Sequence, residues 1–292
     1  MHNNSRTFLV SKQKKTFNLK TTFLTLLFFV SQLANAQPAD EKLIQNLTSN
    51  LTSESRADKM IEIGQKFIGK PYIGGTLESP KEKLICRLDG FDCYTFVETV
   101  LALVLTSESV NPDYDTFAEE VQYLRYREGE INGYSSRIHY FFEWAKLAEK
   151  NGVLNDLTPE LGTKSPKNIN FMSTHRQFYP AFTTNEQVLA EIKAMEKNVN
   201  KYAFNEIKTA DLPEVQSEIK NGDILAFASS VPGLDVNHEG LAYWKGNKLH
   251  FLHASSAEKK VVISDQTLQD YLNSIKKDTG LMVLRLVEDS DL

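Results

Sequence analysis

The most distinctive pattern in the chain is a run of apolar residues that follows a short turn. From Phe96 to Leu105 almost every residue is apolar, which is typical of a helix that is buried on nearly all sides. Asp92 suits the N-cap position of such a helix, and Gly90 suits the tight turn before it. We therefore predict a buried helix whose first turn contains Cys93.

Further helices are indicated on both sides of this run. Apolar residues at helical spacing predict helical structure at 41–68, 116–150 and 186–195. The segment 69–75, Gly-Lys-Pro-Tyr-Ile-Gly-Gly, interrupts the first of these patterns and places Tyr72 shortly before the cysteine. The remainder of 151–208 shows no regular period, so we expect irregular structure there.

From residue 221 onward the apolar period changes to two. This pattern predicts strands at 223–228, 238–244, 248–253, 260–264 and 281–287, with one helix at 268–275. Helices first, followed by a compact antiparallel set of strands, predict an α+β fold. We expect a single domain over residues 37–292 with a mainly helical or irregular insertion at about 110–215.

The first 36 residues have the pattern of a secretory signal peptide. A basic, acid-free start is followed by the apolar run 23–30 and by Ala-Asn-Ala, which ends at Ala36. This run is well short of the roughly 20 residues that span a bilayer. We expect cleavage after Ala36, export to the periplasm and no stable membrane anchor.

Charge and cysteine content narrow the function classes. The chain has 33 basic and 38 acidic residues, and all charged residues of the leader are basic, so the exported part is more acidic still. Such a protein is a poor candidate for binding nucleic acid or anionic membranes. Two cysteines, Cys86 and Cys93, are too few for a disulfide scaffold, and a bond between them would block the thiol of Cys93.

The position of Cys93 suggests a nucleophile. A thiol in the first turn of a helix feels the positive end of the helix dipole, so we expect a lowered pKa. The alternative is a small apolar residue that only packs in the core.

A predicted hairpin brings two histidines together. Lys245-Gly-Asn-Lys248 has the form of a two-residue turn, which pairs Gly240 with His253. His238 is then a diagonal neighbour of His253 on the same face, whereas His250 lies on the opposite face. Gly240 and Ala242 share the face of His238, and we expect these small residues to let the cysteine helix approach.

This set has the logic of a thiol acyl-transfer enzyme. Cys93 attacks a carbonyl, His238 transfers the proton, and His253 fixes the tautomer of His238. The backbone N–H of Cys93 contributes to an oxyanion site. A zinc site is the alternative for one Cys and two His, but the chain contains neither C-x-x-C nor H-E-x-x-H. We therefore expect no metal and no cofactor.

Five blocks of the sequence resemble, in order, the signatures of the NlpC/P60 papain-like cell-wall hydrolases. They are Gly-Lys-Pro-Tyr-Ile-Gly-Gly at 69–75, Gly-Phe-Asp-Cys-Tyr-Thr-Phe-Val at 90–97, Asn-Gly-Asp-Ile-Leu at 221–225, His-Glu-Gly-Leu-Ala-Tyr at 238–243 and Leu-His-Ala-Ser-Ser at 252–256. The form of the cysteine block, the long segment after it and Arg-Ile-His-Tyr at 137–140 resemble the DUF1460 branch, described as N-acetylmuramoyl-L-alanine amidase-like.

The resemblance implies a papain-like fold with Cys93, His238 and His253 as the catalytic set and Tyr72 beside the nucleophile. It also implies a muropeptide substrate, cut between N-acetylmuramic acid and L-Ala. Tyr94 stands where the common pattern has a small residue, and the hairpin between the histidines is longer than usual. Both departures put the common cut, between D-Glu and the diamino acid, in doubt.

Residues outside the catalytic set are also candidates for substrate contact. Arg137, His139 and Tyr140 lie in the segment peculiar to this branch, as do Arg176 and Tyr179. Cationic side chains there would meet the carboxylates of a stem peptide, and the alternative is ordinary surface and core packing. The further candidates are Asp92, which we expect to cap the helix, Glu98, which either orients substrate or is a satisfied buried group, and Asp235, expected in the loop before His238.

The leading hypothesis is thus an exported cysteine amidase acting on muropeptides. A γ-D-glutamyl-diamino acid endopeptidase would use the same residues. A non-catalytic cell-wall binding module is the alternative from another class, and the complete Cys, His and His set argues against it. The sequence leaves the oligomeric state open.

Overall fold

The central helix of the fold is α4 (Cys93–Ser107), and it begins at the cysteine. In this computed structural model, which describes residues 38–79 and 81–288, Asp92 caps α4: its side chain accepts a hydrogen bond from the Thr95 N–H (2.9 Å). The Thr95 hydroxyl accepts one from the Asp92 N–H (3.0 Å) and completes a capping box. The predicted signal peptide lies outside the described residues.

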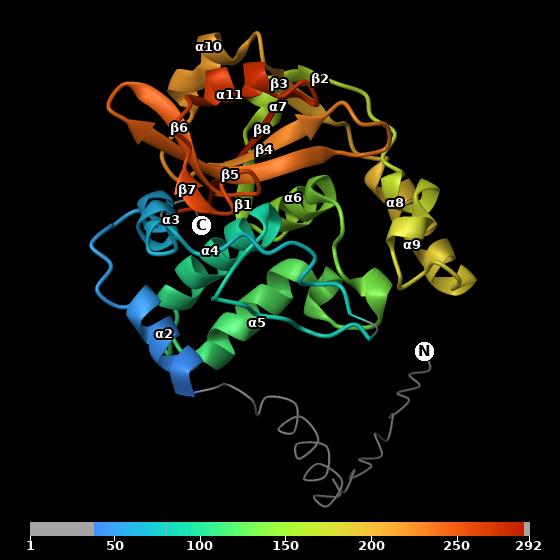
Figure 1. The fold of residues 1–292 in the computed structure, drawn as a ribbon, viewed down its shortest axis with the longest axis horizontal. Helices are drawn as coiled ribbons and strands as arrows, with labels where there is room; N and C mark the ends of the chain where they lie inside the picture. The colour runs from blue at the N-terminus through green and yellow to red at the C-terminus, as the bar shows by residue number, and fades with distance from the viewer. Residues whose placement is uncertain (1–37, 80, 289–292) are drawn as a thin grey trace, which may run out of the picture. The chain divides into compact units, whose positions relative to one another are not determined.

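Four helices lie around or beside α4, and another side of α4 packs against the sheet (Figure 1). They are α2 (Pro38–Thr48), α3 (Arg56–Gln65), α5 (Tyr114–Arg125) and α6 (Phe141–Lys150). The sequence predicted one helical stretch where α5 and α6 occur. The chain instead turns through residues 126–140, where Gly129 and Gly133 adopt positive φ angles that glycine tolerates best.

In the described part of the chain, eight strands form one antiparallel sheet. The order is β2-β3-β8-β4-β5-β6-β7, and β1 pairs with β8. The strands are β1 (Leu154–Asp156), β2 (Thr163–Lys164), β3 (Asn205–Lys208), β4 (Ile224–Ser229), β5 (Val236–Lys245), β6 (Lys248–Ser255), β7 (Lys260–Ile263) and β8 (Asp278–Leu286). The sequence predicted β4 to β8. It missed β1 to β3, which are short and lie in the segment expected to be irregular.

The remaining elements are short connectors and one long helix. They are α7 (Thr158–Leu161), α8 (Phe171–Thr174), α9 (Glu186–Val199), α10 (Leu212–Val215) and α11 (Leu268–Ser274), with 3₁₀ turns at Arg127–Gly129, Tyr134–Ser136, Arg176–Phe178 and Gln216–Glu218. The predicted helices at 186–195 and 268–275 correspond to α9 and α11. Within the described residues, no helix is both long and apolar enough to cross a membrane.

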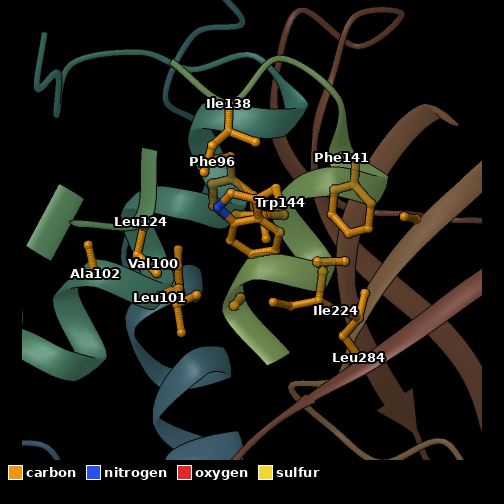
Figure 2. Packing of buried hydrophobic residues seen from close by; sticks show 14 of the residues in the cluster. Phe96, Val100, Leu101, Ala102, Leu124, Ile138, Phe141, Trp144, Ile224 and Leu284 are labelled. Carbon is orange, nitrogen blue, oxygen red and sulfur yellow. The ribbon is translucent and has the colours of Figure 1, made fainter. Parts of the chain in front are cut away.

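The two faces of the sheet are buried against different partners. Ile224, Leu241 and Leu252 belong to the cluster that contains the apolar residues of α4. Figure 2 shows this cluster, with Trp144 of α6 between residues of α4 and the strand residues Ile224 and Leu284. The opposite face carries a second cluster, which includes Leu225, Phe227, Phe251 and residues of α10 and α11. The sheet is therefore covered on both sides, and α4 lies on one side only.

Candidate active site

The hairpin of β5 and β6 has the predicted register. Lys245 pairs with Lys248 and Leu241 with Leu252, and Gly246 in the turn has φ 63°. His250 pairs with Tyr243, and its Nδ1 lies 2.9 Å from the Ser264 carbonyl oxygen. His250 therefore takes no part in the pair formed by the other two histidines.

His238 and His253 contact one another directly. Nε2 of His238 lies 2.6 Å from Nδ1 of His253, and the two rings meet edge to face with centroids 4.9 Å apart. His253 is 4% exposed, and the ring of Phe251 lies beside it at 4.4 Å. This contact leaves Nδ1 of His238 as the nitrogen available to another partner, and the Nε2–Nδ1 contact fixes the orientation of the ring.

Cys93 lies against the backbone of β5 next to His238. The backbone N–H groups of Glu239 and Tyr94 both act on the pKa of its thiol, which places the sulfur close to them. The first of these N–H groups belongs to the peptide unit that joins His238 to Glu239, so the thiol is adjacent to the histidine backbone. The structure thus brings the three predicted catalytic residues to one place, two from the hairpin and one from the start of α4.

The prediction of a lowered pKa for Cys93 is wrong. Burial raises the pKa of the thiol, and the carboxylates of Glu239 and Asp92 raise it further. The two backbone N–H groups that contact the sulfur act in the opposite direction but do not compensate. The helix start therefore holds a neutral thiol and not a resting thiolate.

Both histidines are neutral as well. Burial lowers the pKa of His238 to about 4. Burial, and then the neighbouring His238, lowers that of His253 to about 3. A neutral imidazole beside a neutral thiol suits general-base activation, in which the proton leaves sulfur as the sulfur attacks.

The expectation that α4 approaches the face of Gly240 and Ala242 is also wrong. A Cβ atom at Gly240 would touch His253 and Phe251, and Ala242 belongs to the second cluster. The body of α4 packs on the opposite face because Leu241 and Leu252 point that way. The first residue of α4, Cys93, lies close to Glu239, which follows His238 in β5.

Two side chains that the sequence did not single out border the site. The Tyr271 ring of α11 lies 6.2 Å from both His238 and His253, centroid to centroid, and Cys93 contributes to raising the pKa of its phenol to about 12, after burial and Asp278. Glu239 is 5% exposed, and its Oε2 has no hydrogen-bond partner among the described residues. Nothing in the sequence marked Tyr271. For Glu239, the one signal in the sequence is a charged residue inside a strand that is expected to be buried.

Tyr72 lies beside the segment that leads into α4. Its N–H donates to the Lys259 carbonyl (2.9 Å), and it forms a parallel bridge with Phe91. Burial, followed by the charges of Cys93 and Asp92, raises the pKa of the phenol to about 12. The phenol is thus part of the surroundings of Cys93.

The proposed substrate contacts from 137–140 have internal partners. Arg137 is 6% exposed and forms ion pairs with Glu78 and Glu82 (2.8 and 3.1 Å). Nε2 of His139 lies 2.9 Å from the Tyr134 carbonyl oxygen, and burial lowers its pKa well below the ordinary value. The Tyr140 hydroxyl donates to Glu196 and accepts from the Met172 N–H (both 2.9 Å). A role for these residues in substrate contact stays a prediction.

The other polar candidates are also held internally. Glu98 is fully buried, pairs with the Arg125 guanidinium and accepts a hydrogen bond from the Tyr94 hydroxyl (2.9 Å). Asp235 is 2% exposed and accepts from the Phe142 N–H (2.8 Å). Arg176 pairs with Glu186 (2.8 Å). The rings of Tyr179 and Phe182 stack.

Two further features of the molecule are the state of its cysteines and the groups that could bind a metal. Cys86 and Cys93 are both free. Across 38–79 and 81–288, no cluster of three or more His, Cys, Asp or Glu residues has an arrangement that could hold a metal ion. A thiol free to react is what a nucleophilic role requires.

The chain is similar to a described family and to several solved structures. The family model described as AmiA-like, N-acetylmuramoyl-L-alanine amidase-like, matches residues 62–281. An N-acetylmuramoyl-L-alanine amidase from Bacteroides uniformis ATCC 8492 is 37% identical, with 80% of this chain and 99% of that chain covered and a TM-score of 0.76.

Two further structures extend the comparison. A candidate xylanase from Bacteroides fragilis is 37% identical, with 76% of this chain and 99% of that chain covered and a TM-score of 0.71. A Legionella pneumophila protein of the DUF1460 family model is 24% identical, with 85% and 95% covered and a TM-score of 0.65, and this likeness concerns the fold alone. No curated protein matches the chain.

Proposed function

The chain belongs to the AmiA-like, N-acetylmuramoyl-L-alanine amidase-like family, and we propose that it is a cysteine amidase that releases peptides from muropeptides. Family membership and the similar amidase structures make it an enzyme, a hydrolase with a peptidoglycan amidase-like function. The bond we assign is the amide between the lactyl group of N-acetylmuramic acid and L-Ala. The observation that carries the cysteine mechanism is the free Cys93 thiol at the start of α4, close to the strand residue that follows His238, together with the contact between His238 and His253.

The proposed reaction has two steps. The Cys93 sulfur attacks the lactyl carbonyl carbon while its proton passes to His238, and the tetrahedral intermediate collapses to a thioester as His238 returns the proton to the departing amine of L-Ala. Water then attacks the thioester with His238 again as base, which releases the muramic acid carboxylate and restores the thiol. His253 holds His238 in the required orientation through the 2.6 Å contact between their ring nitrogens.

The backbone at the start of α4 supports the charged intermediate. The oxyanion would lie near the N-terminal N–H groups of the helix, which carry a partial positive charge and have no partner within the helix. The Cys93 N–H is one such donor in the proposed mechanism. Tyr72 would border the acyl group from the opposite side.

We also propose the finer assignments that the sequence suggested. A helix that begins at a cysteine and packs against an antiparallel sheet supports a papain-like arrangement of the NlpC/P60 type. Export through the leader would bring the enzyme to peptidoglycan fragments in the periplasm. Cleavage between D-Glu and the diamino acid is the competing bond for the same residues, and a binding module without turnover is the competing class.

The products of one digestion test the assignment. A disaccharide-tripeptide is incubated with the protein or with the Cys93→Ala variant, and the fragments are weighed by mass spectrometry. We expect free tripeptide and intact disaccharide from the wild type and no cleavage by the variant. Disaccharide that still carries L-Ala-D-Glu would establish the endopeptidase. Xylan is the control polymer because one similar structure carries a xylanase description, and we expect it to remain uncut.

A further inference from the structure

A cavity of about 390 Å³ lies beside His253. Its walls come from the end of β6, from β7 and the segments on either side of it, and from α11, and they include His253, Ser255, Ala257, Lys260, Ser264 and Tyr271. The volume is in the range of roughly 300 to 1,000 Å³ that is usual for small-molecule sites. The mechanism above makes no use of this space.

Three walls of the cavity connect it to the catalytic residues. His253 bonds to His238, and the Tyr271 ring contacts both histidine rings. Lys260 forms a β-bridge with Pro71, the residue before Tyr72. A group bound here is therefore next to the histidine pair and to the segment that borders Cys93.

The lining mixes apolar side chains, Ala257, Val262 and Ile263, with polar ones, and its charged residues include more acid than base. Hydroxyls come from Ser255 and Ser264, an amide from Gln266, and one half-buried aromatic ring from Tyr271. Glu258 and Asp265 are the acidic residues of the wall, and Lys260 is the basic one. A stem peptide carries several carboxylates, which this wall would repel, whereas an N-acetylated sugar ring is neutral and rich in hydroxyls. Serine hydroxyls and an aromatic face are groups that suit such a ring.

We propose that this cavity is the subsite for the sugar side of the substrate, in which the N-acetylmuramoyl ring lies against Tyr271. The assignment rests on the proposed function, because it decides which half of a muropeptide lies on which side of Cys93. The peptide that leaves then extends away from the β6–β7 turn. The sugar ring contributes to specificity even though the bond that is cut lies outside it.

Two substrates that contain the same amide, one with the sugar ring and one without it, distinguish recognition of the sugar from cleavage of the amide. N-acetylmuramoyl-L-Ala-D-Glu contains the ring, and D-lactoyl-L-Ala-D-Glu lacks it. The Ala257→Trp variant places a large side chain at the exposed rim of the cavity, and Ser256→Trp is the matched control because Ser256 is the exposed neighbour that does not line it. The quantity compared is kcat/KM for the muramoyl compound divided by kcat/KM for the lactoyl compound. We expect Ala257→Trp to lower this ratio by about tenfold or more and Ser256→Trp to leave it unchanged.

A ratio that is unchanged in Ala257→Trp, whether both substrates lose activity equally or neither does, would overturn the subsite. Calorimetry in the Cys93→Ala background provides a readout without turnover. Tighter binding of the muramoyl compound than of the lactoyl compound, lost when Ala257→Trp is added, supports the subsite even if the wild type cuts neither compound. If neither compound is cut but the muramoyl compound still binds more tightly, the proposed bond is rejected and the subsite is kept. If the two compounds bind equally, the subsite is rejected.

Discussion

The Cys93 sulfur lies among groups that disfavour a negative charge on it. Burial dominates, and Glu239 and Asp92 add two carboxylates at short range. Glu239 itself is buried with an unpartnered oxygen, and burial raises the pKa of its carboxyl well above the ordinary value. Burial thus holds the thiol protonated until a base removes the proton during attack, and the Glu239 carboxyl adds repulsion wherever it is itself ionised.

The first prediction concerns Glu239→Gln. The Glu239 carboxyl repels a thiolate at the alkaline pH where both groups ionise, so replacing it takes away one cause of the raised thiol pKa and the pKa of Cys93 should fall. The measurement is the pH dependence of alkylation by iodoacetamide, read on the Cys93 peptide by mass spectrometry so that Cys86 does not contribute. Glu258→Gln, at an exposed position in the turn after β6, is the control. An unchanged or higher thiol pKa in Glu239→Gln would show that the carboxylate does not act on the sulfur.

The second prediction compares the two histidines of β6. His253→Ala removes the partner that orients His238 and should lower kcat/KM by about 100-fold. His250→Ala removes a side chain that contacts the Ser264 carbonyl on the other face, so its effect should be within about threefold. Steady-state kinetics on a muropeptide check both variants. Equal damage from the two changes would place His250 in the site, contrary to the hairpin register.

At the scale of elements, α4 and the β5–β6 hairpin position the reacting groups. The sequence predicted both because their signals are local: an Asp cap before an apolar run, and a two-residue turn between alternating strands. The small strands β1 and β3 pair with β8 far along the chain, and no local pattern encodes such a pairing. The face that α4 covers was missed for the same reason, since it depends on where Leu241 and Leu252 meet Phe96.

The third prediction concerns the cap of α4. Asp92→Ala removes the side chain that accepts from the Thr95 N–H (2.9 Å) and should lower the free energy of unfolding by about 1 kcal/mol. Asp92→Asn keeps an accepting oxygen and is the matched control. Urea denaturation followed by circular dichroism measures both variants. If the Ala variant is as stable as the Asn variant, the cap does not contribute to holding the start of α4.

At the scale of the molecule, the site depends on residues far apart in sequence that the sheet brings together. Cys93 and the hairpin could be predicted because each lies in a recognisable block. Tyr271 could not, because it reaches the histidines only through the packing of α11 on Phe227 and Phe251. The direction of the Cys93 pKa was likewise beyond the sequence. It depends on the depth of burial and on Glu239 from another element.

The fourth prediction is the pH dependence of the whole enzyme. His238 must be neutral to accept the thiol proton, and its pKa is lowered to about 4. Activity should therefore persist as the pH falls through the usual histidine range and should be half lost near pH 4. The unfolded chain, with ordinary histidines, binds more protons below about pH 6.5, so stability also falls as the pH drops from there. The profile of kcat/KM is measured where circular dichroism shows folded protein, and a half-loss near pH 6.5 in folded protein would contradict the neutral pair.

The most direct test of the cysteine amidase is the mass of the trapped acyl-enzyme. The protein is mixed with a disaccharide-tripeptide, quenched with acid within the first turnover, and weighed intact and after digestion. We expect an adduct with the mass of the disaccharide acyl group, located on the peptide that contains Cys93 and absent from Cys93→Ala. An adduct that also contains L-Ala and D-Glu would move the cut to the D-Glu bond. Turnover that persists in Cys93→Ala would contradict the nucleophile itself.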